Sequence, residues 1–255
     1  MYAMDIDDLC RPGTEEDIII SPRRGRNEKP IPESGVLLVN PTEAKYAMAK
    51  ILREGGQARN IYHSQLCIHS SNQFFVAGPA VSSPVAAMTA EKLIALGARK
   101  IYLFSWCGAI SPELKIGNVV IGDLPFSGEG TSQYYVTGEP ILPATYSTAK
   151  LQDAALQMGK HARVGNIWTT DAPYRENRCF FRQLLEEKEV VGIDMEYSAL
   201  CAVSSFRNVD FAGIFIVSDE LWGDKWLPGF KNPEFLATSR KLIDLLLTNH
   251  FHGKD

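Results

Sequence analysis

Short apolar runs alternate with segments of helical periodicity along most of the chain. The runs at 36–39, 74–78, 101–104, 117–123, 164–168, 190–193 and 211–217 predict strands, and the segments at 44–52, 84–96, 176–188, 196–205 and 233–247 predict helices. Near-continuous apolar strands that alternate with helices indicate a sheet covered on both faces. The pattern therefore predicts an α/β fold, with a single domain over residues 34–255.

The first 33 residues lack this periodicity. They contain arginines within 23–26 and prolines at 22, 30 and 32, and proline blocks regular structure and removes a backbone donor. We expect residues 1–33 to form an extended arm that wraps the body of the protein or a neighbouring subunit.

The composition is that of an ordinary globular protein, since 45% of the 255 residues are hydrophobic and 22% are charged. The formal net charge of -4 argues against a nucleic-acid binder, which usually presents a strongly basic face. No apolar stretch approaches the ~20 residues of a membrane span, and the first residues do not resemble a secretory signal. We therefore expect a cytoplasmic protein that interacts with neither nucleic acid nor membranes.

The cysteines and histidines do not form a recognisable metal-binding pattern. The five cysteines contain no C-x-x-C pair, and the five histidines contain no H-E-x-x-H motif. An odd number of widely spaced cysteines fits free or buried thiols in a reducing cytoplasm. We predict no metal site.

Ligands of open α/β sheets bind beyond the carboxyl ends of the strands. The segments that follow the apolar runs here are 40–43, 105–109, 169–178, 194–196 and 218–224. They contain no G-x-G-x-x-G, G-K-[ST] or G-x-S-x-G motif, which argues against a dinucleotide site, a P-loop and a common serine hydrolase. We expect the functional site at these strand ends, without a bound cofactor.

Three carboxylates of these segments each have two interpretations. Asp194 and Glu196 stand between a strand and a helix, where acids complement the helix dipole but can also hold the vicinal hydroxyls of a ribose. Asp219 ends a buried strand, where it can stabilise a turn or, when partly buried, act as a general acid near neutral pH. The residue types alone leave these alternatives open.

Three segments, taken in order, resemble the purine nucleoside phosphorylase and uridine phosphorylase family. SWCGAI followed by LKIGNVVI, at 105–121, is similar to the family's glycine-rich turn and its vGDvvi strand. VGIDMEYSAL, at 191–200, resembles the vdMEaaal signature, and IVSD, at 216–219, resembles the vSD of the purine branch. Weaker similarity lies at 128–135 and 164–174. The resemblance implies a nucleoside phosphorylase-like fold, with a central mixed sheet flanked by helices.

The same resemblance implies cleavage of a nucleoside N-glycosidic bond through an oxocarbenium-like transition state. Glu196 would then hold the ribose hydroxyls, and Asp219 would protonate or hydrogen-bond purine N7. Met195 would pack against the sugar, and Ser218 would orient Asp219. Tyr174 and Trp168 would lie near the base, and Arg178 lies where uridine-specific members read the pyrimidine. The remaining expected substrate contacts are Asp194 and, in the glycine-rich turn, Cys107 and Gly108. Tyr174 and Trp168 also fit a purely structural role in the core.

The phosphate site departs from the family pattern. Where phosphorolytic members have GDPxRa, residues 39–44 read VNPTEA, so Glu43 replaces an arginine, and a carboxylate repels phosphate. Arg59 and Arg175 are the candidates for a rebuilt site, with phosphate as a possible co-substrate. Hydrolytic members carry a glutamate in this loop that activates water, so Glu43 is either a general base or a solvated helix acid.

The sequence thus predicts an enzyme, either a pentosyltransferase or an N-ribosyl hydrolase. The expected partner is a small-molecule nucleoside, of purine type because of Asp219. The alternative is a catalytically silent relative that binds ligand. The resemblance also implies a homo-oligomer, either a dimer or a hexamer.

Overall fold

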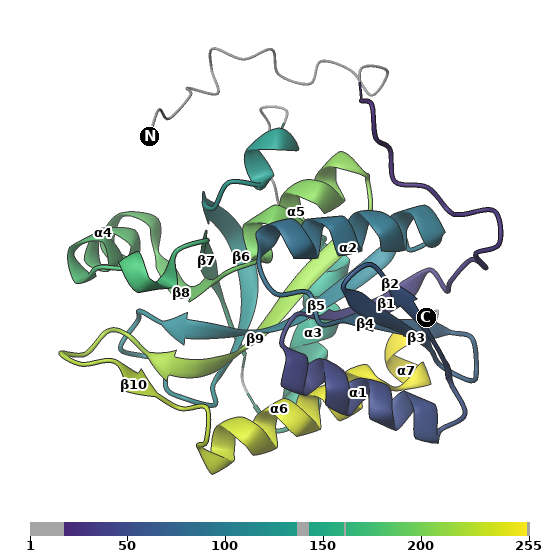
Figure 1. Ribbon diagram of the computed structural model, residues 1–255. Helices are drawn as coiled ribbons and strands as arrows, with labels where there is room; N and C mark the ends of the chain where they lie inside the picture. The colour runs from purple at the N-terminus through teal and green to yellow at the C-terminus, as the bar shows by residue number, and fades with distance from the viewer. Residues whose placement is uncertain (1–17, 137–142, 161, 254–255) are drawn as a thin grey trace.

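The computed structural model describes residues 18–136, 143–160 and 162–253 (Figure 1). The strands are β1 (Ser34–Leu38), β2 (Gln57–Ile61), β3 (Ser64–Ile68), β4 (Phe74–Gly78), β5 (Lys100–Ala109), β6 (Val119–Gly128), β7 (Ala162–Thr170), β8 (Val190–Asp194), β9 (Asp210–Glu220) and β10 (Leu227–Pro228). The helices are α1 (Pro41–Arg53), α2 (Ser83–Leu96), α3 (Thr145–Gln157), α4 (Arg178–Lys188), α5 (Tyr197–Phe206), α6 (Pro233–Leu246) and α7 (Asn249–His252), with short 3₁₀ turns η3 (Ser132–Tyr134) and η4 (Pro173–Arg175).

The strands form one mixed sheet in the order β10-β9-β6-β7-β8-β5-β1-β4-β3-β2, and β9 also pairs with β5. The strands β5, β9, β6, β7 and β8 therefore close into a ring. The ring closes through β5, whose first half pairs with β1 and whose last two residues pair with β8, while β9 runs parallel to it throughout. This arrangement confirms the predicted α/β fold with a central mixed sheet.

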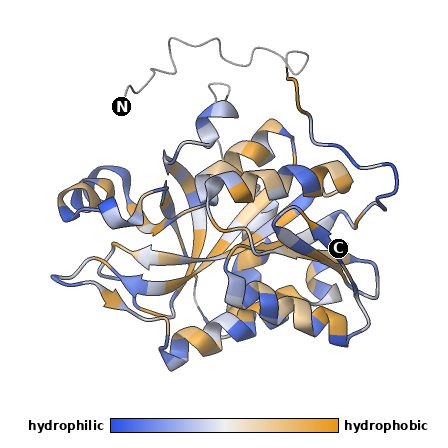
Figure 2. Cartoon of the chain, viewed as in Figure 1, coloured by the Kyte–Doolittle hydropathy of each residue, from blue (hydrophilic) through white to orange (hydrophobic). Residues whose placement is uncertain are grey.

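Helices cover both faces of the sheet, as the continuous apolar strands predict. Successive strand residues point to opposite faces, so Leu37 and Leu103 pack with apolar residues of α2 and α5. Leu38 and Phe104 pack with apolar residues of α1, α3 and α6. In Figure 2 the helix ribbons carry both apolar and polar stretches, as amphipathic helices do. The two core layers hold the strand ends in fixed positions.

The hairpin of β2 and β3 and the helix α3 are absent from the elements that the sequence predicts. In β2 only Ile61 is buried, so the strand has no apolar alternation and is held by its backbone pairing with β3. In α3 the buried positions include the small residues Ser147, Ala154 and Ala155, which give a weak apolar period. Both elements owe their stability to neighbours in space.

Residues 18–33 contain neither helix nor strand and contact the second half of α2. The buried Lys92 Nζ donates to Glu28 Oε2 at 2.5 Å and to the Arg23 carbonyl at 2.9 Å. Ile31 is buried against the same helix, where its N–H donates to the Leu96 carbonyl. Residues 1–17 of the predicted arm lie outside the described residues, and the arm boundary at residue 33 stays a prediction. Over the described ranges, no helix is long and apolar enough to span a membrane.

Candidate active site

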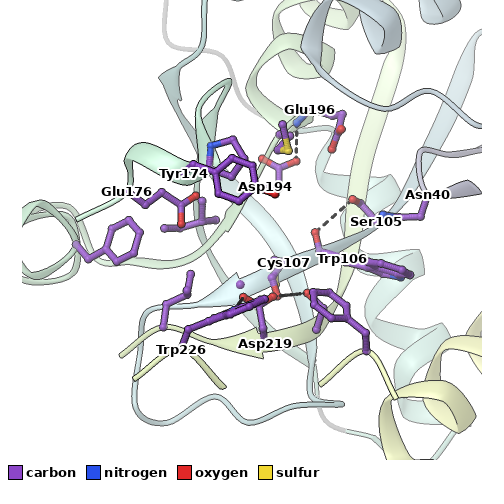
Figure 3. Close-up of a pocket in the computed structure, with 18 of the residues that line it drawn as sticks. Asn40, Ser105, Trp106, Cys107, Tyr174, Glu176, Asp194, Glu196, Asp219 and Trp226 are labelled. Atoms are coloured by element: carbon purple, nitrogen blue, oxygen red, sulfur yellow. Dashed lines mark hydrogen bonds between the residues drawn. The ribbon is translucent and has the colours of Figure 1, made fainter. Parts of the chain in front are cut away.

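A cavity of about 640 Å³ opens at the carboxyl ends of the strands. It is lined by Asn40, Val81, Ser105, Trp106, Cys107, Gly108, Pro173, Tyr174, Glu176, Asn177, Arg178, Phe181, Ile193, Asp194, Met195, Glu196, Ser218, Asp219, Leu221, Trp226 and Phe230. All five strand-end segments named from the sequence contribute to this wall. Figure 3 shows Tyr174 and Glu176 on one side of the cavity and Asn40, Ser105 and Trp106 on the other.

Asp219 lies near the end of β9 and is held by two donors. Ser218 Oγ donates to Asp219 Oδ1 at 2.6 Å, and Trp226 Nε1 donates to Asp219 Oδ2 at 2.8 Å. A Cβ at Gly108 would lie 3.3 Å from Asp219 Oδ2 and 2.6 Å from Leu221 Cδ1, so the missing side chain keeps this approach open. The carboxyl is thus fixed at the cavity wall by groups from β9 and from the loop after it.

Asp194 and Glu196 occupy the junction of β8 and α5. Asp194 Oδ1 accepts from Thr169 Oγ1 at 2.6 Å, and Asp194 Oδ2 accepts from the N–H groups of Tyr197 at 2.7 Å and Glu196 at 3.0 Å. Asp194 therefore caps the first turn of α5, in agreement with its structural interpretation. Glu196 Oε1 accepts from the Ser82 N–H at 2.7 Å, and Ser82 takes a positive φ of 79° there.

Burial raises the pKa of both carboxyls, and the charge of Asp194 raises the pKa of Glu196 further. Asp194 has three donors that stabilise its ionised form, whereas two backbone N–H groups, those of Ser82 and Met195, act on the carboxyl of Glu196. A proton shared by the pair therefore favours Glu196. A carboxyl in this state can accept from one ribose hydroxyl and donate to the next.

Glu176, between η4 and α4, is a further carboxyl of the cavity wall. The sequence marks it only as the start of a helix. Burial and the negative charge of Asp219 raise the pKa of Glu176 to about 7. The signal that could have identified it is its position after β7, within the strand-end segment 169–178.

The structure brings most of the predicted substrate contacts to the cavity: Asp194, Met195, Glu196, Ser218, Asp219, Cys107, Gly108, Tyr174 and Arg178. Tyr174 is 99% exposed at the rim, so it is not a core residue. The guanidinium of Arg178 donates to the Asp224 carbonyl, which joins α4 to the loop that carries Trp226. Their roles toward a substrate stay predictions.

Glu43 does not line the cavity. It is 1% exposed on the face of α1 that packs against α6, and its Oε1 accepts from Ser239 Oγ at 3.3 Å. Asn40, the extended residue that precedes the helix, does reach the cavity, whereas Glu43 lies in the first turn of α1 and contacts Ser239 of α6. Glu43 is therefore neither a solvated helix acid nor placed to activate a water in this cavity.

Trp168, Arg59 and Arg175 also lie outside the cavity lining. The Trp168 ring packs edge-on against Phe180 and Phe181 of α4, so its structural interpretation holds. Arg59 lies on β2, at the far edge of the sheet, and donates to the Lys29 carbonyl at 2.8 Å. Arg175 is exposed on η4. Arg178 is thus the only basic residue of the lining within the part of the chain that the structure describes.

A family model described as the phosphorylase superfamily matches residues 33–248. The chain belongs to the phosphorylase superfamily. This assignment confirms the resemblance read from the motifs at 105–121, 191–200 and 216–219.

Within the superfamily, the chain is similar to curated bacterial enzymes. It is 27% identical over 203 residues to the DeoD-type purine nucleoside phosphorylase of Caldanaerobacter subterraneus subsp. tengcongensis, covering 77% of this chain and 87% of the relative. It is 25% identical to the DeoD-type purine nucleoside phosphorylase of Oceanobacillus iheyensis, covering 77% of this chain and 86% of the relative.

Solved structures share the fold. Purine nucleoside phosphorylase from Toxoplasma gondii, in complex with immucillin-H, superposes with a TM-score of 0.72 at 19% identity, over 84% of this chain and 88% of that one. AMP nucleosidase from Bacteroides thetaiotaomicron superposes with a TM-score of 0.66 at 19% identity, over the same shares of the two chains. The superfamily fold therefore accommodates proteins named as phosphorylases and as nucleosidases.

Proposed function

We propose that this protein cleaves the N-glycosidic bond of a purine nucleoside. The observation that carries the proposal is the presence of the Asp219 and Glu196 carboxyls in one cavity, near the end of β9 and just after β8, two strands that both pair with β5. In Figure 3 Glu196 lies above Asp219, and the cavity that both residues line has a volume of about 640 Å³, within the range of small-molecule sites. The names of the similar enzymes support the same substrate class.

In the proposed reaction the bond between C1′ and N9 breaks, and its electron pair passes to the purine. Asp219 donates a proton or a hydrogen bond to N7, which stabilises the leaving base. Glu196 binds the 2′- and 3′-hydroxyls while positive charge develops on the sugar. Met195, which lines the same wall, packs its thioether against the ribose. An oxygen nucleophile then bonds to C1′, and a water in this role gives up one proton, which replaces the proton that Asp219 gave to the base.

The lining favours water over phosphate as that nucleophile. It contains the carboxyls of Glu176, Asp194, Glu196 and Asp219, whereas its basic side chain, Arg178, is engaged with the Asp224 carbonyl. A cavity with this balance repels a phosphate dianion but admits a neutral water. Hydrolysis is therefore the proposed reaction, and phosphorolysis, the reaction in the names of the curated relatives, is the second candidate.

We further infer that the protein works without a cofactor, on a small-molecule nucleoside, in the cytoplasm and as a homo-oligomer. Exposed apolar side chains support the last inference: Val81 at the cavity rim is 47% exposed and Met88 on α2 is 46% exposed. A dimer or hexamer would bury such side chains. Light scattering of the purified chain measures the assembly directly.

A nucleoside panel with and without phosphate tests the proposed function. Base released equally in both conditions supports hydrolysis, and base released only with phosphate establishes phosphorolysis instead. Release from no nucleoside, in either condition, would leave the silent ligand-binding alternative and refute the enzymatic proposal.

A further inference from the structure

Glu176 differs from the other carboxyls of the cavity in its hydrogen bonding. Asp194, Glu196 and Asp219 each accept hydrogen bonds from the protein. Within the described ranges no donor is hydrogen-bonded to the Glu176 carboxyl, although the side chain is half-buried in the wall. A partly desolvated carboxyl without a partner is costly, so Glu176 is available to bind a polar group of a ligand.

The charged groups around Glu176 come from three neighbouring elements. Asp219 of β9 faces it across the cavity and is the charge that acts on it most strongly. Arg178, at the start of α4, is engaged by the Asp224 carbonyl. Asp194 and Glu196 line the wall near α5, where they contact Thr169 and Ser82. The neighbourhood is acidic, so Glu176 changes its protonation near neutral pH.

The chemistry of a purine decides which group meets Glu176. In the proposed function, Asp219 binds N7 of the base, and the substituent at C6 is the next polar group along the same edge of the ring. Among the carboxyls of the lining, Glu176 is the one whose pKa the charge of Asp219 raises, so it is the candidate partner of this substituent. A 6-amino group is a hydrogen-bond donor and a 6-oxo group is an acceptor. Glu176 must therefore accept a hydrogen bond from the first base and donate one to the second.

We propose that Glu176 is the residue that discriminates between 6-aminopurine and 6-oxopurine nucleosides. The inference rests on the proposed function and deepens it. The ionised side chain accepts from a 6-amino group and repels a 6-oxo oxygen. The protonated side chain donates to a 6-oxo oxygen and still offers its carbonyl oxygen to a 6-amino group.

Selectivity for the base therefore depends on pH. Burial and the charge of Asp219 raise the pKa of Glu176 to about 7, so the carboxylate dominates above this pH and the acid below it. Preference for the 6-amino base rises with pH. The other titrating groups cancel in this comparison, because Asp219 meets N7 and Glu196 meets the ribose in both nucleosides.

The experiment is the ratio of kcat/KM for adenosine to that for inosine, measured at about pH 6 and about pH 8. We expect the ratio in the unsubstituted protein to rise about tenfold, the effect of one hydrogen bond to a charged group. In Glu176→Gln the amide can rotate to donate or accept at either pH, so the ratio becomes independent of pH. The matched control is Glu187→Gln, an exposed glutamate of the adjacent helix α4 that is not part of the cavity lining.

Three outcomes decide the proposal. A ratio that does not change with pH in the unsubstituted protein overturns it, as does an unchanged pH dependence in Glu176→Gln. Glu176→Asp keeps the carboxyl but withdraws it by one methylene. The ratio of kcat/KM for adenosine to that for inosine should still rise with pH in this variant, but by a smaller factor. This variant replaces Glu176→Gln in the test if the glutamine variant does not fold.

Binding separates failure of this inference from failure of the proposed function. If no nucleoside is cleaved, calorimetric titration with adenosine and with inosine at the same two pH values measures the same discrimination as a ratio of Kd values. A pH-dependent ratio that Glu176→Gln abolishes supports Glu176 as the selector in a silent relative. Binding of neither nucleoside overturns the inference together with the function.

Discussion

The replacement Asp219→Asn tests the proposed leaving-group acid with little disturbance of the fold. The asparagine can turn Oδ1 toward Trp226 Nε1, which only donates, and Nδ2 toward Ser218 Oγ, which can also accept. Both contacts of the carboxyl therefore have an equivalent in the variant. The ability to transfer a proton to the base is lost.

The size of the expected loss follows from this geometry. General acid catalysis contributes about 10²–10⁴-fold, and the remaining amide can still polarise the purine through its dipole. We therefore expect kcat/KM for a purine nucleoside to fall about 10²-fold, which corresponds to about 2.7 kcal/mol of transition-state stabilisation. The variant should bind nucleoside with nearly unchanged affinity, because Glu196 and the cavity wall are intact.

The assay compares two substrates in the same variant. Release of free purine is measured by chromatography, and release of 4-nitrophenol from a 4-nitrophenyl riboside is followed by absorbance. The nitrophenolate leaves without a proton, so its release should change little in Asp219→Asn. Asp224→Asn is the matched control, since that side chain is exposed and only its backbone carbonyl is engaged by Arg178.

Two results would refute the reasoning. A loss of less than about threefold for the purine nucleoside would remove Asp219 from the leaving-group step, given the contribution expected of a general acid. An equal loss for both substrates would mean that Asp219 acts on the sugar or on the nucleophile.

Three further predictions follow from the contacts of single residues. Glu196→Ala should reduce the preference for ribosides over 2′-deoxyribosides about tenfold, because the carboxyl that accepts from one ribose hydroxyl and donates to the next is lost; unchanged preference would contradict the sugar role. Gly108→Ala should lower activity with a modest loss of stability, because the new Cβ would lie 2.6 Å from Leu221 Cδ1 and 3.3 Å from Asp219 Oδ2. Kinetics measures the activity and thermal unfolding measures the stability; a variant with wild-type rates would contradict this prediction. Burial lowers the pKa of His252 to about 3, so the folded state binds a proton on this ring less readily than the unfolded state does. The free energy of unfolding is therefore unaffected by His252 above pH 6.5 and falls as the pH drops from there toward 3. Urea unfolding should show roughly 2 kcal/mol lost by about pH 5, a loss that His252→Gln should lack.

The pattern along the chain predicted the parts of the fold that depend on local and repetitive features. Strands such as 101–104 and 211–217 are apolar without interruption, and a strand of this kind is stable only when both of its faces are covered. The predicted ends of some strands were too early, since β5 continues to Ala109 and β6 to Gly128, but the segments 40–43, 105–109 and 194–196 do reach one cavity. The hairpin of β2 and β3 escaped prediction because its stability comes from backbone pairing at the edge of the sheet.

The site residues also differ in whether local sequence features were sufficient to identify them. Asp219 and Glu196 were identifiable because their motifs and their place at strand ends are properties of the sequence. Glu43 has an equally suggestive motif, yet the phase of α1 turns it toward Ser239 of α6. Glu176 has no motif at all and becomes a cavity residue only because its loop folds over the end of β9.

By itself, then, the sequence determined which segments are strands and helices, which family they compose and which carboxyls end the strands. Only the tertiary structure decided which of those carboxyls share a cavity and which groups hold them. The physical reason is the range of the interactions. Periodicity and chain position are local, whereas the contact of Glu196 with Ser82, the contact of Glu43 with Ser239 and the shared cavity join segments that are far apart in the chain.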